Sequence, residues 1–391
     1  MKRILGLIIV CSIFALATLN VLAVSDTKYV AETVVKTDNV LEVNANSAVL
    51  MEADTGAVLL SQNQDDKAPL ASVTKIMTLI LVMEAIEDGK ISTSDKIVVS
   101  DFAASMGGSQ VFLEEGEEML VEELIKCTVI ASANDAAVAL AERIGGSEKL
   151  FVQMMNSKAK ELGMKNTNFE NVTGLDDTAT NHYSSAFDIA IMSRELIKYD
   201  LIKKYSSLWQ DTIRNGEFTL TNTNRLVRYY DGCNGLKTGS TDKAGFCISA
   251  TAERDGMQLI AVIMGAETRD IRNAEARSML DFGFSNYAVY HNGEQALENI
   301  PINKGIKNFT TVYSGEFSCI IPKSKLKDVE LVFEIPDKIT APMFKNDKVG
   351  KINYKLGETL LGTSDIFVAE DIPKITYLDM LLKIIKCIFV G

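Results

Sequence analysis

A serine and a lysine three residues apart, Ser72 and Lys75, could act together as a nucleophile and its base. The spacing alone is a weak signal, because Ser-x-x-Lys occurs five times in this chain, starting at Ser25, Ser72, Ser157, Ser240 and Ser324. Ser72 differs from the others in its context. It stands at the head of an apolar run with helical spacing, made of Ile76, Leu79, Ile80 and Met83.

A helix that begins at Ser72 would place the side chains of Ser72 and Lys75 one turn apart on the same face. Serine is favoured at helix starts, and Pro69 disfavours a helix before it. The free N–H groups and partial positive charge at a helix start would suit an oxyanion formed at the serine. The alternative interpretation is a capped core helix that happens to contain a lysine.

Two later stretches carry further candidate residues. Ser132-Ala133-Asn134 lies in an alanine-rich segment that we expect to be helical, although helix interiors do not favour serine and asparagine. Lys237-Thr238-Gly239 is predicted on a strand, where Gly239 would let a substrate backbone approach. A lysine, a hydroxyl and an open strand edge together suit a peptide that ends in a carboxylate.

Composition excludes several other classes of function. The net charge of −12 argues against nucleic-acid binding, which needs a basic surface. The chain has only two histidines, His182 and His291, and no His-Glu-x-x-His, so a zinc peptidase is not expected. It also lacks the Gly-x-Ser-x-Gly elbow of many serine hydrolases. A base other than histidine is therefore expected, and we predict no metal and no cofactor.

The order of the three motifs resembles that of the serine penicillin-recognising enzymes. Ser132 follows Ser72 by 60 residues, and Lys237 follows Ser132 by 105. The stretch 231–246, Asp-Gly-Cys-Asn-Gly-Leu-Lys-Thr-Gly-Ser-Thr-Asp-Lys-Ala-Gly-Phe, and the upstream 173–177 narrow the resemblance. Between residues 45 and 286 the chain is similar to the low-molecular-mass penicillin-binding proteins that are D-alanyl-D-alanine carboxypeptidases. Val172-Thr173 departs from the Pro-His that this family often has, at a loop position that we do not expect to be catalytic.

The resemblance implies a role for each candidate residue. Ser72 would form an acyl ester with a stem peptide of peptidoglycan that ends in D-Ala-D-Ala, and Lys75 would be its base. An ordinary lysine pKa is near 10.4, so burial and the charge of Lys237 would have to lower it. Ser132 would relay a proton to the leaving nitrogen, and Asn134 would position Lys75 and the substrate. The substrate would be bound by Lys237, Thr238, Gly239, Ser240 and Arg272, with backbone N–H groups of Ser72 and Ser240 as the oxyanion hole. β-Lactam antibiotics would be covalent inhibitors, and His182 would be a structural loop residue.

The predicted elements agree with an α/β (α+β) transpeptidase fold of the β-lactamase-like type. Residues 47–60 indicate a hairpin, helical patterns dominate from 72 to about 203, and strands return at 235–240, 246–251 and 258–264 before a helix over 273–282. Strands at both ends of this region predict one sheet built from both ends, with a helical subdomain inserted between them.

The remaining segments predict the localisation. Residues 1–23 have the charged start, apolar middle and small-residue end of a signal peptide, and residues 24–45 form a lead-in. The catalytic domain is assigned to 46–286, a small β-sandwich to 287–371, and an amphipathic helix to 372–391. Thr376, Asp379, Lys383 and Lys386 would form one polar stripe on that helix, whose 16 central residues span about 24 Å, short of a bilayer core of about 30 Å. We therefore expect a secreted protein attached to the outer face of the cytoplasmic membrane by a helix lying in its surface.

Two alternatives to a carboxypeptidase remain. A class A-like β-lactamase shares the motif order but needs a deacylating glutamate in a Glu-x-x-x-Asn loop, whereas here Asn171 follows Glu170 directly. A non-catalytic wall-binding homologue is disfavoured by the intact Ser72, Lys75 and Lys237. The four cysteines of the folded body match no metal site, and we expect them to be buried free thiols: Cys127, Cys233, Cys247 and Cys319.

Overall fold

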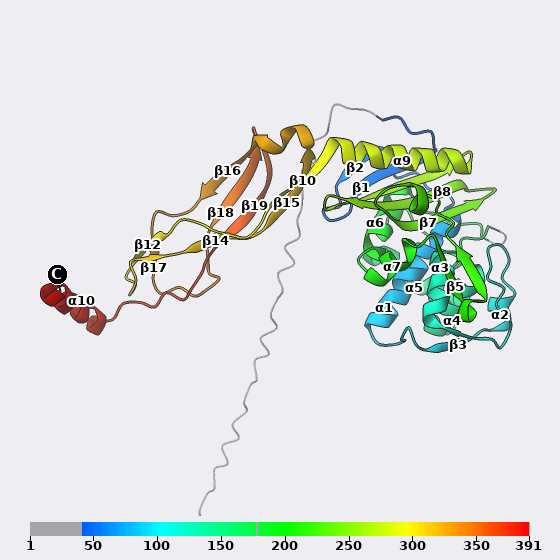
Figure 1. Ribbon diagram of the computed structural model, residues 1–391, viewed down its shortest axis with the longest axis horizontal. Coiled ribbons are helices and arrows are strands. Elements are labelled where there is room, and N and C mark those ends of the chain that lie inside the picture. Colours follow the sequence, from blue (N-terminus) through cyan, green and yellow to red (C-terminus); the bar gives the residue numbers. More distant parts are fainter. Residues whose placement is uncertain (1–40, 177–178, 391) are drawn as a thin grey trace, which may run out of the picture.

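The computed structural model describes residues 41–176 and 179–390. The predicted signal peptide and most of the predicted lead-in therefore lie outside the described residues. Figure 1 shows a mixed α/β domain at one end, a β domain beside it, and helix α10 at the far end.

One five-stranded antiparallel sheet organises the catalytic domain, with strand order β2-β1-β9-β8-β7. Its strands are β1 (Ser47–Glu52), β2 (Val58–Gln62), β7 (Cys233–Thr241), β8 (Gly245–Arg254) and β9 (Met257–Ala266). Strand β1 pairs with β9, so the two ends of the domain meet in the sheet as the sequence predicts. Strand β7, which carries Lys237-Thr238-Gly239, is an edge strand and leaves one side open to a substrate.

Both faces of this sheet are covered, and alternate residues of β1 serve different cores. Ala48 and Leu50 pack in the core below helix α9 (Arg269–Asn286), whereas Val49 and Met51 pack in the larger core of the helical subdomain. Side chains alternate between the faces of a strand, so burial on both faces explains why β1 reads as a continuous apolar run. Figure 1 shows α9 on one side of the sheet and the helical subdomain on the other.

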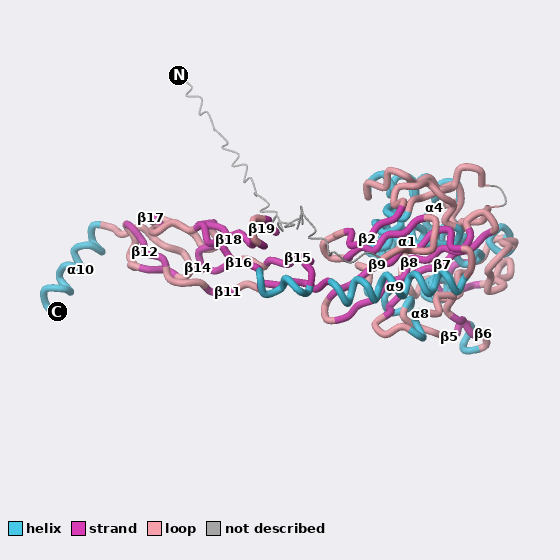
Figure 2. The backbone as a smooth tube through the Cα atoms, turned by 90° about the horizontal axis from the view of Figure 1, so that it is seen from above, coloured by secondary structure: helices cyan, strands magenta, loops and turns pink. Residues whose placement is uncertain are grey.

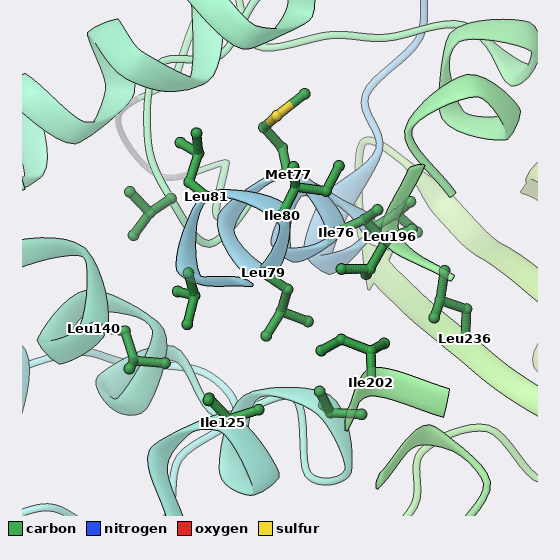
Figure 3. Close-up of a cluster of buried hydrophobic side chains, with 14 of the residues drawn as sticks. Ile76, Met77, Leu79, Ile80, Leu81, Ile125, Leu140, Leu196, Ile202 and Leu236 are labelled. Atoms are coloured by element: carbon green, nitrogen blue, oxygen red, sulfur yellow. The ribbon is translucent and has the colours of Figure 1, made fainter. Parts of the chain in front are cut away.

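Helix α1 (Lys75–Glu87) runs through the centre of the larger core. Ten of its thirteen residues are buried, so this helix is surrounded on all sides rather than amphipathic. Figure 3 shows its apolar side chains meeting Ile125, Leu140 and Ile202 from neighbouring elements. The remaining elements of this domain are β3 (Lys96–Val98), α2 (Asp101–Ala104), β4 (Glu118–Leu120), α3 (Val121–Val129), α4 (Asn134–Gly145), α5 (Glu148–Glu161), α6 (Ala186–Leu196), α7 (Asp200–Ser206), β5 (Gln210–Ile213), β6 (Phe218–Thr221) and α8 (Leu226–Tyr229). Because helix α1 is held on all sides by the larger core, the residues at and just before the start of the helix, Lys75 and Ser72 among them, have fixed positions.

Three expected elements differ in detail from the structure. Ser72 lies in a 3₁₀ turn (Ala71–Thr74) that leads into α1, and its side chain does not cap the helix. Ser132 is not inside a helix, because α3 ends at Val129 and α4 begins at Asn134. Helix α9 begins at Arg269, so Arg272 lies within the helix, whose predicted start was 273.

The second domain is built from strands. They are β10 (Tyr287–Asn292), β11 (Gln295–Ala296), β12 (Ile300–Asn303), β13 (Phe309–Thr310), β14 (Val312–Ser314), β15 (Phe317–Pro322), β16 (Val329–Glu334), β17 (Ile339–Thr340), β18 (Lys348–Leu356) and β19 (Thr359–Val368). Strands β11, β14, β19, β18 and β16 form one sheet, and the rest form two smaller sheets. Strands β16 and β18 pair with each other in antiparallel orientation.

Strand β15 contributes to two cores at once. Its Ile320 packs with Tyr287 in the core below α9, whereas Cys319 and Ile321 pack in the core of the β domain. This follows from the alternation of side chains along a strand that lies between two domains.

Helix α10 (Tyr377–Val390) lies at the end of the β domain away from the catalytic domain, as Figures 1 and 2 both show. Its apolar side chains are exposed, with Tyr377 at 92% and Ile388 at 69%. The side chains of Lys383 and Lys386, two members of the predicted polar stripe, are not described. Among the described residues, no helix combines the length and apolar character needed to cross a membrane.

Candidate active site

The sequence-predicted residues come together in one cleft at the edge strand β7. A cavity of about 460 Å³ contains Ser72, Ser132, Thr238, Gly239, Ser240 and Arg272 among its lining residues. Lys75, Asn134 and Lys237 lie directly behind this surface, hydrogen-bonded to Ser72, to Lys75 and to Ser132 respectively. The structure therefore brings together all nine of the residues predicted from the sequence.

A strained turn presents the serine. Ala71, just before it, has φ of +48°, a left-handed conformation that alanine rarely adopts. Gly174 packs against this turn, since a Cβ on Gly174 would lie 1.8 Å from the carbonyl oxygen of Ala71. Ser72 itself remains half-buried and open to the cavity. Strain of this kind persists only where the surrounding packing holds it.

Lys75 is fully buried and makes three polar contacts. Its Nζ lies 3.0 Å from Ser72 Oγ, 2.5 Å from Asn134 Oδ1 and 3.1 Å from the carbonyl oxygen of Thr173. Burial, and next the charge of Lys237, hold the pKa of Lys75 well below its usual range, against a weaker opposing effect of Asp135. The lowered pKa that the sequence argument required of Lys75 is therefore found, from the expected causes.

The break between α3 and α4 positions Ser132 and Asn134. Ser132 has φ of +61°, and its Oγ accepts a hydrogen bond of 2.8 Å from Lys237 Nζ. Asn134 begins α4, and its Nδ2 donates to the carbonyl oxygen of Gly107, which turns Oδ1 toward Lys75. The unusual serine and asparagine in an alanine-rich segment thus mark a break in the helix.

Strand β7 supplies the other wall. A Cβ on Gly239 would lie 2.8 Å from the backbone nitrogen of Ser72, so this glycine lets the strand approach the serine closely. Burial, and next the charge of Arg272, lower the pKa of Lys237 to about 7. Ser240, the following residue, is exposed and lines the cavity beside Ser72.

Arg272 is buried, contrary to the alternative of an exposed surface arginine. Its guanidinium donates to Asn273 Oδ1 and reaches the cleft from the first turn of α9. Burial, and next the charge of Arg269, lower its pKa to about 10. A buried cation beside Lys237 and Thr238 fits a carboxylate.

Sequence reasoning missed two residues of the site. The carbonyl of Thr173 contacts Lys75, so the loop at the Val172-Thr173 departure does reach the catalytic lysine. Because this contact is made by the main chain, it does not require a particular side chain there. Thr223 Oγ1 accepts a hydrogen bond of 2.8 Å from Thr238 Oγ1, and no sequence signal marked Thr223.

His182 is a structural residue, as expected. Its Nδ1 accepts from the backbone N–H of Glu170, and its Nε2 lies 2.8 Å from Thr74 Oγ1. Burial lowers its pKa to about 4, so the imidazole is neutral, and it connects the backbone at Glu170 to Thr74 in the turn that carries Ser72. Cys127, Cys233, Cys247 and Cys319 are free thiols, and all but the half-buried Cys233 are buried as expected.

Comparison with known proteins agrees with this geometry. Residues 32–268 match the family model described as D-alanyl-D-alanine carboxypeptidase, and residues 284–374 match the C-terminal domain of penicillin-binding protein 5. The chain is 45% identical to the D-alanyl-D-alanine carboxypeptidase DacF of Bacillus subtilis, over 87% of this chain and 88% of the relative.

Two solved structures extend the comparison. Penicillin-binding protein 5 of Haemophilus influenzae is 32% identical, with a TM-score of 0.74 over 86% of this chain and all of that one. Penicillin-binding protein D2 of Listeria monocytogenes, solved with bound ampicillin, is 32% identical with a TM-score of 0.58, over 63% of this chain and 99% of that one. The first similarity extends through both domains, and the fold class predicted from the sequence is confirmed.

Proposed function

Because the chain belongs to the family of D-alanyl-D-alanine carboxypeptidases, we propose that it removes the terminal D-alanine from peptidoglycan stem peptides through an acyl ester on Ser72. The carboxypeptidase activity follows from the family. The residue roles rest on one observation above all, the contact between Ser72 Oγ and the buried Nζ of Lys75.

The surroundings of Lys75 suit a neutral amine. A neutral lysine has two hydrogens and one lone pair, and two of its three neighbours, Asn134 Oδ1 and the Thr173 carbonyl, can only accept. With both hydrogens donated to them, the lone pair faces the hydroxyl of Ser72. Lys75 can then take the Ser72 proton as the oxygen attacks the carbonyl carbon of the penultimate D-alanine.

The oxyanion formed in this attack would be bound by the backbone N–H groups of Ser72 and Ser240, which both line the cavity. Collapse of the tetrahedral intermediate breaks the C–N bond and leaves the acyl group on Ser72. Ser132 donates its hydroxyl proton to the leaving nitrogen and is reprotonated with the proton that Lys75 took from Ser72. Lys237 Nζ donates to Ser132 Oγ, which leaves the Ser132 hydrogen free for this role. Lys237, Thr238 and Arg272 hold the terminal carboxylate. Water then hydrolyses the ester and restores the Ser72 hydroxyl.

The alternatives find less support. A β-lactamase would need a glutamate that activates the deacylating water, but the Glu170 carboxylate accepts hydrogen bonds from the backbone of Thr180 and Asn181 and does not line the cavity. A non-catalytic homologue would have no need for a buried, hydrogen-bonded Ser72–Lys75 pair. The penicillin-binding relatives support slow covalent inhibition by β-lactams at Ser72.

For localisation we keep the proposal made from the sequence. An N-terminal signal would export the protein, and α10 would hold it at the outer face of the cytoplasmic membrane. The row of exposed apolar side chains on α10 supports this, because such a surface is costly in water and suits a bilayer interface.

Mass spectrometry of a pentapeptide stem incubated with the protein tests the function. We expect loss of one D-alanine, which requires the Ser72 hydroxyl, and stoichiometric uptake of labelled penicillin. Release of a longer fragment, or rapid turnover of penicillin at substoichiometric protein, would refute this assignment.

A further inference from the structure

The cleft contains more positively charged side chains than are needed to bind the single carboxylate of a D-Ala-D-Ala terminus. Besides the buried Arg272, it is lined by Arg225 and Arg269, which are both exposed. None of the described residues that line the cavity is acidic. Within the described chain, the guanidinium groups of Arg225 and Arg269 make no ion pair and no hydrogen bond. The single carboxylate of D-alanine is already matched by Lys237, Thr238 and Arg272.

In the proposed reaction the substrate would lie along β7, with its oxyanion beside Ser240 and its terminal carboxylate beside Thr238 and Arg272. The same cavity is also lined by Thr223, Arg225 and Arg269. The charges of Arg225 and Arg269 both act on Arg272, so the two arginines lie next to the proposed carboxylate site, at the leaving-group end of the cleft.

An aromatic wall closes the same end. The carbonyl of Trp209 accepts from the backbone N–H of Asn222, and its ring lies under the guanidinium of Arg228 and against Tyr229. Trp209 lines the cavity together with Thr221 and Asn222. Next to the proposed carboxylate site the cavity is therefore lined by an aromatic ring and polar side chains.

The electrostatics agree with this placement. Burial is the largest of the effects that lower the pKa of Arg272 to about 10, and the charges of Arg269 and Arg225 contribute to the same shift, against opposing effects of Cys247 and Asp270. The repulsion among the three arginine charges is reduced when a second anion, in addition to the terminal carboxylate, binds between them.

We propose that the leaving-group end of the cleft is a subsite for a D-amino acid whose side chain ends in a carboxylate, bound by Arg225 and Arg269. The inference rests on the proposed function and adds a substrate class to it. The reaction is unchanged: Ser72 acquires the acyl group, the same C–N bond breaks, and the leaving amine takes the proton through Ser132. Only the side chain of the departing residue differs.

The experiment compares three peptides with the same acyl part, ending in D-Ala-D-Ala, D-Ala-D-Glu and D-Ala-D-Gln. D-Gln has nearly the same shape as D-Glu but no side-chain charge. The ratio of kcat/KM for the D-Glu peptide to that for the D-Gln peptide therefore measures the effect of the side-chain charge alone. We expect this ratio to be about fivefold or more in the full protein, and to fall toward one in Arg225→Ala/Arg269→Ala. Added salt should also lower it, because both arginines are exposed.

Two variants serve as controls. Arg277→Ala removes an exposed arginine from the same helix as Arg269 but outside the cavity, and it should keep the ratio. Arg225→Lys keeps the charge and should retain most of the preference. A ratio near one in the unaltered protein, or a ratio that the double variant leaves unchanged, overturns the subsite while D-Ala-D-Ala is still hydrolysed. If D-Ala-D-Ala itself is not hydrolysed, the proposed function fails and the subsite with it.

Discussion

Two lysines of the cleft, Lys75 and Lys237, must be in opposite protonation states in the proposed mechanism. There Lys75 would accept a proton and must be neutral, whereas Lys237 would bind a carboxylate and must be charged. Burial lowers both pKa values, and Lys75 is also repelled by Lys237 while Lys237 is repelled by Arg272. A positively charged Lys237 therefore helps to keep its neighbour neutral, and the substrate carboxylate helps to keep Lys237 charged.

Substitution of the central pair should show that the two residues act as one unit. Ser72→Ala should abolish peptide hydrolysis and covalent penicillin labelling, since the acyl ester has nowhere to form. Lys75→Ala should lower kcat nearly as far, because Ser72 loses its base, and the double variant should be scarcely worse than either single one. Steady-state kinetics and labelled penicillin measure both effects. One equivalent of label on Ser72→Ala would show that another serine is the nucleophile.

The pH dependence of kcat/KM should be bell-shaped. The rate rises with pH as Lys75 loses its proton, and it falls as pH rises through the pKa of Lys237, about 7 in the free protein. Arg272→Gln removes a positive charge beside Lys237, so the pKa of Lys237 rises and the alkaline limb moves to higher pH, while KM increases. Arg277→Gln is the matched control and should leave the limb in place. An alkaline limb that stays or moves to lower pH in Arg272→Gln contradicts this assignment.

At the scale of elements, the position of Ser72 depends on the packing of the 3₁₀ turn against the loop at Gly174. Gly174→Ala would bring a Cβ to 1.8 Å from the Ala71 carbonyl at a φ of +84°. Gly89→Ala is a useful control, since Gly89 has a similar φ of +69° but no neighbour within 4 Å.

We expect Gly174→Ala to lower the free energy of unfolding by about 3 kcal/mol or more and to reduce acylation, because the turn must shift. Gly89→Ala should cost only about 1 kcal/mol, the strain of the left-handed backbone, with activity retained. Chemical denaturation and penicillin acylation measure the two effects. Equal costs for both variants would show that the close contact is not important.

Much of this organisation could be predicted from the sequence, because its signals are local. The hairpin at Asp54-Thr55-Gly56 and the pairing of β8 with β9 follow from alternation and turn residues. The site residues were found because motif order is visible along the chain. The break before Asn134 was not predicted, because it depends on the positive φ of Ser132, which the residue type does not indicate. Thr223 and the Thr173 carbonyl were missed because their contacts join residues that lie far apart in the sequence and belong to no motif.

At the scale of the whole molecule, the catalytic domain and α10 lie at opposite ends (Figure 2). If α10 is the membrane anchor proposed above, deletion of residues 375–391 should release the protein from membranes and leave hydrolysis of a soluble acyl-D-Ala-D-Ala peptide nearly intact. Leu378→Ser/Leu382→Ser keeps the length of the helix but removes exposed apolar surface, and it should weaken membrane association without abolishing it. Fractionation and flotation with anionic vesicles measure this. A deletion variant that still sediments with membranes would contradict the anchor.

Strand β15 links the stabilities of the two domains, because Ile320 belongs to one core and Cys319 and Ile321 to the other. Melting of the β domain would therefore expose Ile320 and Tyr287 and weaken the catalytic domain. We expect calorimetry to show one cooperative transition, with equal calorimetric and van't Hoff enthalpies, and expect Ile320→Ala to separate it into two. Two resolved transitions in the unaltered protein would contradict this. The protein would then open to proteases as a whole or not at all, so its resistance to cleavage would depend on a strand in the second domain and not on the segment that carries Ser72.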